Sequence, residues 1–176
     1  FDATADATLQ PLLGGADMIV SVGIDGLDAT DSCVFGKGNI NNYGVSSPVG
    51  DIVATSLDIQ TDSGLYSGTV LENATYTATA SGTARDNTLS TANGGAGFLI
   101  VSSASGTTPT LDAKITHSAD DVTYVDLVTF TQATTTTSEV KLVAEGTTVN
   151  RYLKAEFTVG GTSPSFTAII GFGRNN

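Results

Sequence analysis

Several residue types on which proteins build chemistry are nearly absent from this chain of 176 residues. It has one cysteine, one histidine, one methionine and no tryptophan. A single cysteine excludes an intrachain disulfide framework and a multi-cysteine metal site. Cys33 follows aspartates, which do not favour the reactive thiolate, so we do not expect a nucleophile there. No apolar run approaches the ~20 residues that a membrane helix needs, so we expect no membrane partner.

Basic residues are also scarce. The chain has 7 Lys and Arg against 18 Asp and Glu, which gives a formal net charge of −11. Residues 1–84 hold ten acids and a single base, Lys37, whereas residues 85–176 hold eight acids and six bases. Binding nucleic acid through its phosphates requires clustered Lys and Arg, which this chain lacks. Two interpretations stay open: a solvated acidic surface that maintains solubility, or a surface that lies beside DNA without holding it.

Strand-like alternation is the strongest positive signal. Charged residues make up only 14% of the chain, and threonine, serine, alanine and glycine take their place, which favours β-structure with many turns. Residues 153–159 and 166–172 alternate apolar and polar side chains, and further strands are expected at 18–24, 52–60, 75–81, 97–103, 111–117, 122–131 and 138–144. We expect these alternating positions to be buried: Leu111, Ile115, Leu153, Phe157, Phe166 and Ile170. Only residues 3–15, ending in two glycines, favour a short helix.

The chain is predicted to divide into two parts, residues 1–73 and 74–176. A stretch at 72–92 has almost no large side chains, and the charge balance changes there. The second part supplies about five to six strands, close to a complete sandwich. The first part has fewer strands and resembles an incomplete sheet. Within it, residues 31–51 are expected to form a long irregular segment, and segments of that length are usually functional or belong to an interface.

The best candidate for a chemical site is the group formed by His117, Asp120 and Asp121. It lies between two alternating segments, where the sequence SADD has the residues of a hairpin loop. No second histidine or cysteine is present to complete a metal site, and adjacent aspartates diverge. A turn is therefore the preferred interpretation. Arg151 is expected either to stack on Tyr152 or to pair with a carboxylate on an exposed strand face.

A glycine run at residues 94–97 invites comparison with a phosphate-binding loop. Such a loop opens a helix, but here the following residues, GFLIV, are typical of a strand. Nothing else in the chain has the pattern of a catalytic nucleophile with its base. We therefore expect no enzyme, no cofactor and no metal.

Longer stretches of the chain resemble a known family. Residues 82–131 and 146–175 resemble the C-terminal immunoglobulin-like region of tailed-bacteriophage virion proteins, especially the major tail, or tail tube, proteins. Residues 3–15 resemble the helical stretch of the tube domain, and residues 36–71 resemble its later strands. The resemblance implies an all-β fold: an immunoglobulin-like β-sandwich preceded by a smaller, incomplete tail-tube-like β-region with one short helix.

The resemblance also implies a function. The protein would be a structural virion protein that self-assembles into hexameric rings stacked around a DNA channel, with the immunoglobulin-like domain facing outward. Its partners would be copies of itself, other virion proteins, and genomic DNA that passes without specific binding. It would act in the viral tail, after assembly in the host cytoplasm. The acidic first region would face the channel and repel phosphates.

A loop at residues 25–51 is the expected subunit contact. Its candidate residues are Asp28, Asp31, Asn39, Asn42 and Tyr43. Family tube domains begin with further strands that this chain does not include, so either an upstream portion is missing or this is a shorter relative with another virion role. Two alternative functions therefore stay open. One is a capsid decoration or cement protein, and the other is a receptor- or carbohydrate-binding β-sandwich module.

Overall fold

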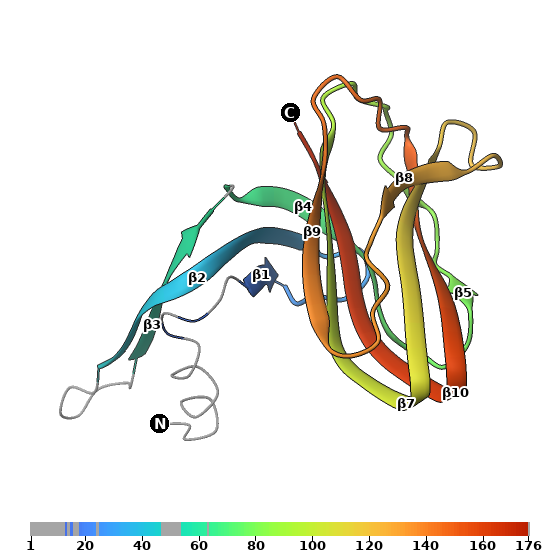
Figure 1. Ribbon diagram of the computed structural model, residues 1–176. Coiled ribbons are helices and arrows are strands. Elements are labelled where there is room, and N and C mark those ends of the chain that lie inside the picture. Colours follow the sequence, from blue (N-terminus) through green and yellow to red (C-terminus); the bar gives the residue numbers. More distant parts are fainter. Residues whose placement is uncertain are drawn as a thin grey trace. The chain divides into compact units, whose positions relative to one another are not determined.

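A computed structural model describes residues 13, 15, 18–23, 25–46, 54–62 and 64–175 (Figure 1). All regular structure among these residues is β-strand, which confirms the all-β prediction. The strands are β1 (Met18–Gly23), β2 (Ser32–Ser46), β3 (Ala54–Thr61), β4 (Tyr66–Tyr76), β5 (Ala80–Ser81), β6 (Arg85–Asp86), β7 (Gly95–Ser118), β8 (Val125–Thr129), β9 (Thr137–Val143) and β10 (Tyr152–Arg174). The helix expected at 3–15 lies outside the described residues, apart from Leu13 and Gly15. The described part contains no helix that could cross a membrane.

The chain forms two compact units. The smaller consists of residues 1–20 and 36–65, and the larger consists of residues 21–35 and 66–176. The boundary expected between residues 73 and 74 falls inside β4. The small side chains near that position suggested a linker, but Val70, Leu71 and Tyr76 of the same strand are buried. Strand β4 therefore belongs to the core of the larger unit.

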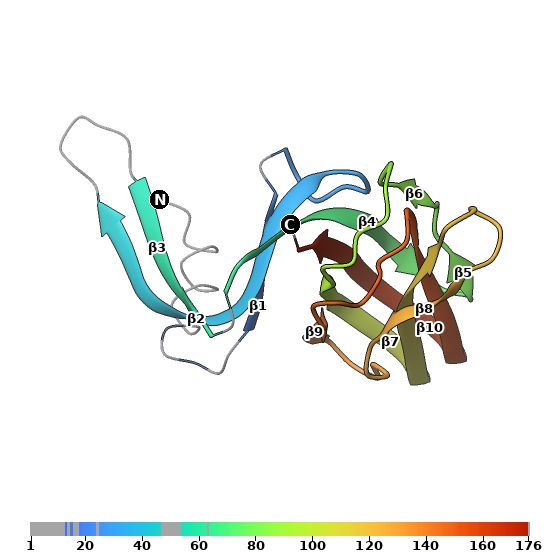
Figure 2. The ribbon, with the colours of Figure 1, turned by 90° about the horizontal axis from the view of Figure 1, so that it is seen from above.

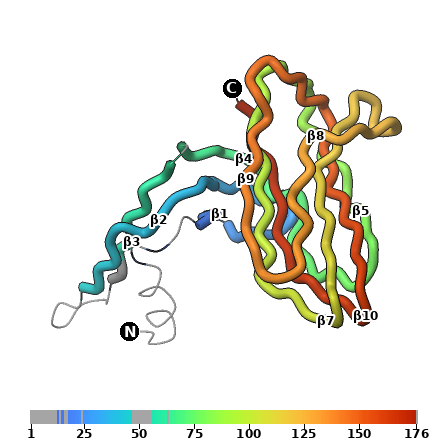
Figure 3. Tube along the Cα trace, in the orientation of Figure 1, coloured from blue at the N-terminus to red at the C-terminus, as the bar shows by residue number. Residues whose placement is uncertain are grey.

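The larger unit is built on two long strands, β7 and β10. They pair antiparallel along their whole length, from Tyr152 opposite Ser118 to Arg174 opposite Gly95. Figure 3 shows both traces bending together at one end of the unit. The first half of β7 pairs with β9, and its second half pairs with β8. The first half of β10 pairs with the short strands β6 and β5, and its second half pairs with β4. The result is a curled antiparallel sheet (Figure 2).

A hydrophobic core lies between the two halves of this curled sheet. It combines Leu99 from the first half of β7 with Leu111 and Ile115 from the second half. All six positions predicted to be core are buried. The rings of Tyr76 and Phe157 stack within this core, with their centroids 4.0 Å apart. Alternation along the strands therefore identified the buried face of the larger unit correctly.

The number of strands differs from the prediction. Segments expected as separate strands at 97–103 and 111–117 are one strand, β7, and those at 153–159 and 166–172 are one strand, β10. The intervening sequences SGTTP and GGTSP have the composition of turns. Instead they are bends at which pairing continues with shifted register, between Gly160 and Ser165 on β10. The two strands bend at the same place, so neither has to leave the sheet.

Candidate functional site

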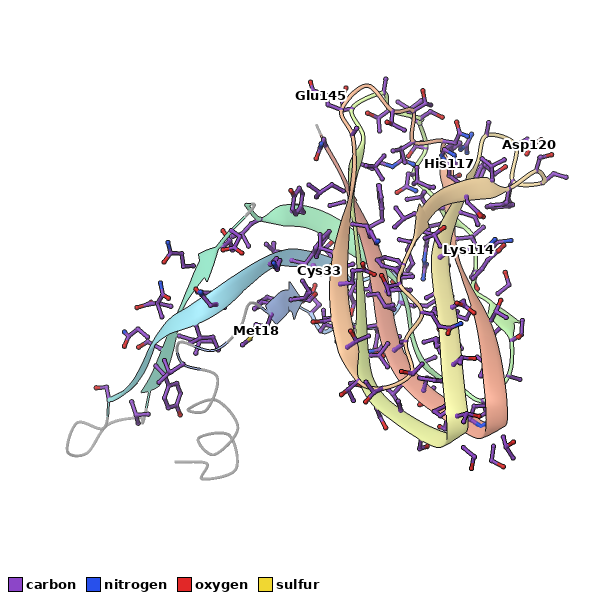
Figure 4. All side chains as sticks on the ribbon, in the orientation of Figure 1. Met18, Cys33, Lys114, His117, Asp120 and Glu145 are labelled. Atoms are coloured by element: carbon purple, nitrogen blue, oxygen red, sulfur yellow. The ribbon has the colours of Figure 1, made fainter. Side chains whose placement is uncertain are left out.

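The group at His117, Asp120 and Asp121 is part of a β-hairpin, as the sequence predicted. His117 lies opposite Val125 in the β7–β8 pair. Figure 4 labels His117 and, in the hairpin loop, Asp120. The Oδ1 atom of Asp120 accepts hydrogen bonds from Ser118 Oγ (2.8 Å) and from the backbone N–H groups of Val122 (3.0 Å) and Thr123 (2.8 Å). Hydrogen bonds from these N–H groups and from the Ser118 hydroxyl favour the charged form and lower the pKa of Asp120 to about 2. This carboxylate stabilises the turn.

His117 has a structural role at the end of β7. Its side chain is 9% exposed, and Nδ1 accepts a hydrogen bond of 3.1 Å from the backbone N–H of Asn150. Burial, and then the nearby positive charge of Arg174, lower the pKa of His117. The neutral imidazole therefore ties β7 to the segment that precedes β10. Among the described residues, no group of three or more His, Cys, Asp or Glu side chains is placed to hold a metal ion.

Arg151 makes both of the contacts considered from the sequence. Its Nε and Nη2 atoms donate to the two carboxylate oxygens of Asp86, each at 2.6 Å. The guanidinium carbon also lies 4.9 Å from the centre of the Tyr152 ring. The hydrogen bond from Arg151 is the main reason that the pKa of Asp86 falls to about 2. The pair joins β6 to the start of β10, but it is exposed to solvent and so contributes little to stability.

Two further sequence motifs belong to strands. Gly95 begins β7, so the glycine run leads into a strand as predicted. Cys33 lies in β2 and is buried, and burial raises the pKa of its thiol. A raised pKa is the opposite of what a nucleophilic cysteine requires.

The strongest candidate for a functional surface is the two-stranded ribbon of β2 and β3 in the smaller unit. In its register Ile40 lies opposite Ile59, Asn42 opposite Asp58 and Tyr43 opposite Leu57. Residues that lie opposite each other project to the same side of a sheet. One face therefore carries apolar side chains, namely Ile40, Tyr43, Val45, Leu57 and Ile59. The other face is polar and carries Asn39, Asn42, Ser56, Asp58 and Gln60.

A β-bulge keeps this ribbon amphipathic. The register shifts by one residue between Ile40 and Asn42, which makes Asn41 the extra residue. Without the bulge, Ile40 and Tyr43 would point to opposite faces, because they are three residues apart. The side chain of Asn41 donates to Gln60 Oε1 at 2.6 Å. The bulge therefore aligns the apolar side chains of β2 on one side.

Polar side chains of the ribbon contact one another through hydrogen bonds and an ion pair. Asn42 Nδ2 donates to Asp58 Oδ2 at 3.0 Å. Near the other end of the ribbon, Lys37 Nζ lies 3.8 Å from a carboxylate oxygen of Asp62. These contacts fix the polar side chains within the ribbon.

The apolar face is only partly covered. Val45 is 42% exposed and Leu57 is 37% exposed. Ile40 is the only large apolar side chain that is buried among the described residues of the smaller unit. Among the described strands, β3 pairs with β2 alone, so no described strand covers its outer edge. Strand β2 also pairs with β1, but a sheet of so few strands with one buried large apolar side chain is marginally stable by itself.

The five residues predicted as a subunit-contact loop do not form one loop. Asp28 and Asp31 lie in a turn before β2, where the Asp28 N–H donates to Asp31 Oδ2 at 3.0 Å. Asn39, Asn42 and Tyr43 lie in β2 itself, the two asparagines on the polar face and Tyr43 on the apolar face.

The irregular segment expected at 31–51 is therefore largely strand. Its glycines suggested turns, but Gly38 is needed because a side chain there would meet the carbonyl oxygen of Gln60 at 2.2 Å. Sequence reasoning did not single out Leu57, although alternation in the expected strand at 52–60 marked its face. Val45 carried no comparable signal.

Comparison with known proteins does not assign this chain to a family. Neither a family model nor a curated protein nor a solved structure matches it, so its function is inferred from its own residues.

Proposed function

We propose that this protein is a self-assembling structural protein of a tailed-phage virion, and that its copies join through the β2–β3 ribbon. The observation that carries the proposal is the exposed apolar face of that ribbon, on which Val45 and Leu57 are the most exposed large apolar side chains. An exposed apolar face beside an open strand edge is a surface that other chains can cover. Burying these two side chains and pairing the β3 edge would stabilise a ribbon that has almost no core of its own.

The charge distribution permits a second copy of the same chain as the partner. Two copies repel each other, because each carries a net charge of −11. The described part of the ribbon carries little of that charge, since its charged residues are Lys37, Asp58 and Asp62, which sum to −1. Repulsion is therefore weakest where the apolar face lies. Repeated identical contacts of this type generate closed rings when the rotation between neighbours closes.

The resemblance to tail tube proteins suggests a more detailed arrangement of the copies. In it, six copies form a ring, the rings stack into a tube, and the larger unit is an immunoglobulin-like domain on the outside. Asp58, which lies in the smaller unit and is exposed, would then face the channel and repel DNA phosphates. No catalytic activity is proposed, and the protein would act in the virion after assembly in the host cytoplasm.

Light scattering after size-exclusion chromatography tests the proposed contact. The wild-type protein is expected to form particles of many subunits, and Leu57→Asp is expected to reduce them to monomers, because a charge would be buried at the interface. Ser56→Asp is the matched control, because it places the same charge on the opposite, polar face of the ribbon. A wild-type protein that stays monomeric, or a Leu57→Asp variant that assembles as well as Ser56→Asp, would contradict the proposal.

A further inference from the structure

The larger unit contains a small cavity that the assembly proposal does not use. Its volume is about 330 Å³, at the lower end of the range of small-molecule sites. It lies within the connection from β8 to β9, above the buried side chain of Leu99. The lining includes five threonines between residues 131 and 137, together with Gln132, Ser138 and Glu139. We call residues 131–139 the threonine cup.

Hydrogen bonds hold the start of the cup in place. Ala133 exchanges two backbone hydrogen bonds with Leu111, at 2.8 and 2.9 Å. Thr131 donates from its backbone N–H (2.7 Å) and its hydroxyl (3.0 Å) to the carboxylate of Glu139. This contact connects the start of the cup to β9, which pairs with β7. The cup is therefore shaped before any ligand arrives, which lowers the entropic cost of binding.

Gln132 adds a further anchor, since its Nε2 atom lies 3.0 and 3.1 Å from the two carboxylate oxygens of Asp112. By contrast, residues 134–137 at the centre of the cup are exposed. These exposed threonines lie between two anchored positions, Ala133 and Glu139.

The charges of the cup argue against an ionic ligand. Glu139 is the only acidic or basic side chain in the lining, and Lys141 Nζ lies 3.0 Å from its Oε1 atom. The same carboxylate already accepts two hydrogen bonds from Thr131. No unpaired cation in the lining is available for a phosphate, and a single occupied carboxylate is insufficient for a divalent cation.

The remaining chemistry suits a neutral molecule with many hydroxyl groups. Each threonine has a hydroxyl and a methyl group on the same carbon, so a pocket lined by threonines can hydrogen-bond to alcohols and also pack against C–H groups. A sugar ring presents this combination of groups on its surface. We propose that the threonine cup binds one sugar residue of a neutral glycan. This binding site is separate from the β2–β3 ribbon and does not depend on assembly.

Saturation-transfer difference NMR tests the proposal on the full chain, because it observes the free sugar whether the protein is monomeric or assembled. The probes are the methyl glycosides of glucose, galactose, mannose and N-acetylglucosamine, with glycerol as the non-sugar control. At least one glycoside is expected to give a saturable signal that glycerol does not give. Thr135→Val keeps the side-chain shape but removes a hydroxyl, and it is expected to weaken binding about tenfold. Thr148→Val, at an exposed threonine outside the cup, is the matched control.

Three results would overturn the proposal. One is the absence of a saturable signal from any of the four glycosides. Another is a glycerol signal as strong as that of the sugars, which would indicate non-specific contact. The third is unchanged binding in both Thr135→Val and Thr136→Val. Melting temperatures of the variants verify that each remains folded.

Discussion

Gly106 of β7 and Gly161 of β10 occupy equivalent positions in the two bends and make reciprocal contacts across them. A side chain on Gly106 would approach the carbonyl oxygen of Ser163 at 2.8 Å, and one on Gly161 would approach the carbonyl oxygen of Thr108 at 2.7 Å. Both glycines have positive φ angles, 122° and 105°. Each glycine therefore leaves room for the bend of the opposite strand, which lets β7 and β10 bend as a pair.

Replacing either glycine by alanine is expected to destabilise the larger unit. Both the positive φ and the close carbonyl oppose a side chain, so Gly161→Ala should lower the free energy of unfolding by at least about 1–3 kcal/mol. Gly146→Ala is the control, because Gly146 also has a positive φ but no atom lies within 4 Å of the added carbon. Urea unfolding measures the difference. Equal losses in the two variants would show that the reciprocal contact is unimportant.

Stability is expected to depend on pH through His117. The folded protein holds the imidazole neutral, because Nδ1 accepts the hydrogen bond from Asn150 and the pKa is lowered from 6.5. The unfolded chain therefore binds the proton at a higher pH than the folded chain does. Stability from this group is complete above about pH 6.5 and decreases as the pH falls toward the lower folded pKa.

Urea midpoints measured between pH 7.5 and 5 test this dependence. In His117→Gln, which has no titrating group at this position, the decrease over that range should be smaller than in the wild type. A wild-type midpoint that stays constant across the range, or an equal slope in the variant, would rule out a role for His117.

Added salt is expected to strengthen assembly. The copies repel through their net charge of −11, whereas the proposed contact is apolar and paired along a strand edge. Screening by salt weakens the repulsion but not the apolar contact. Light scattering from about 0.05 to 0.5 M NaCl, where the Debye length falls from over 10 Å to a few ångströms, should show growing particle mass. Particles that dissociate as salt is added would instead indicate a contact made by ion pairs.

The fold could be predicted where neighbouring residues along one strand carry the information. Leu153 and Phe157 alternate with polar residues, and both are buried as expected. The sequence around Gly161 has turn composition, which predicts two separate strands instead of one bent strand. Its continuity depends on the matching bend around Gly106, 55 positions away in the chain. Local sequence cannot reveal such a pairing.

The same limit applies to the candidate assembly surface. Leu57 and Ile59 alternate, so their common face was readable from the sequence. Tyr43 and Val45 lie on the same face because of the register of β2 against β3 and the bulge at Asn41. Register in a hairpin depends on its turn and on its bulges, and a segment rich in Gly and Asn specifies it weakly. The expectation of an irregular loop followed from that weakness.

Electron cryo-microscopy of the assembled wild-type protein tests the central claim most directly. We predict rings or tubes in which Val45 and Leu57 of each copy are buried against a neighbouring copy and the edge of β3 is paired. We also predict that the exposed carboxylates of the smaller unit, such as that of Asp58, face the channel. Particles with these two side chains exposed, or with the larger unit lining the channel and the carboxylates outside, would contradict the account.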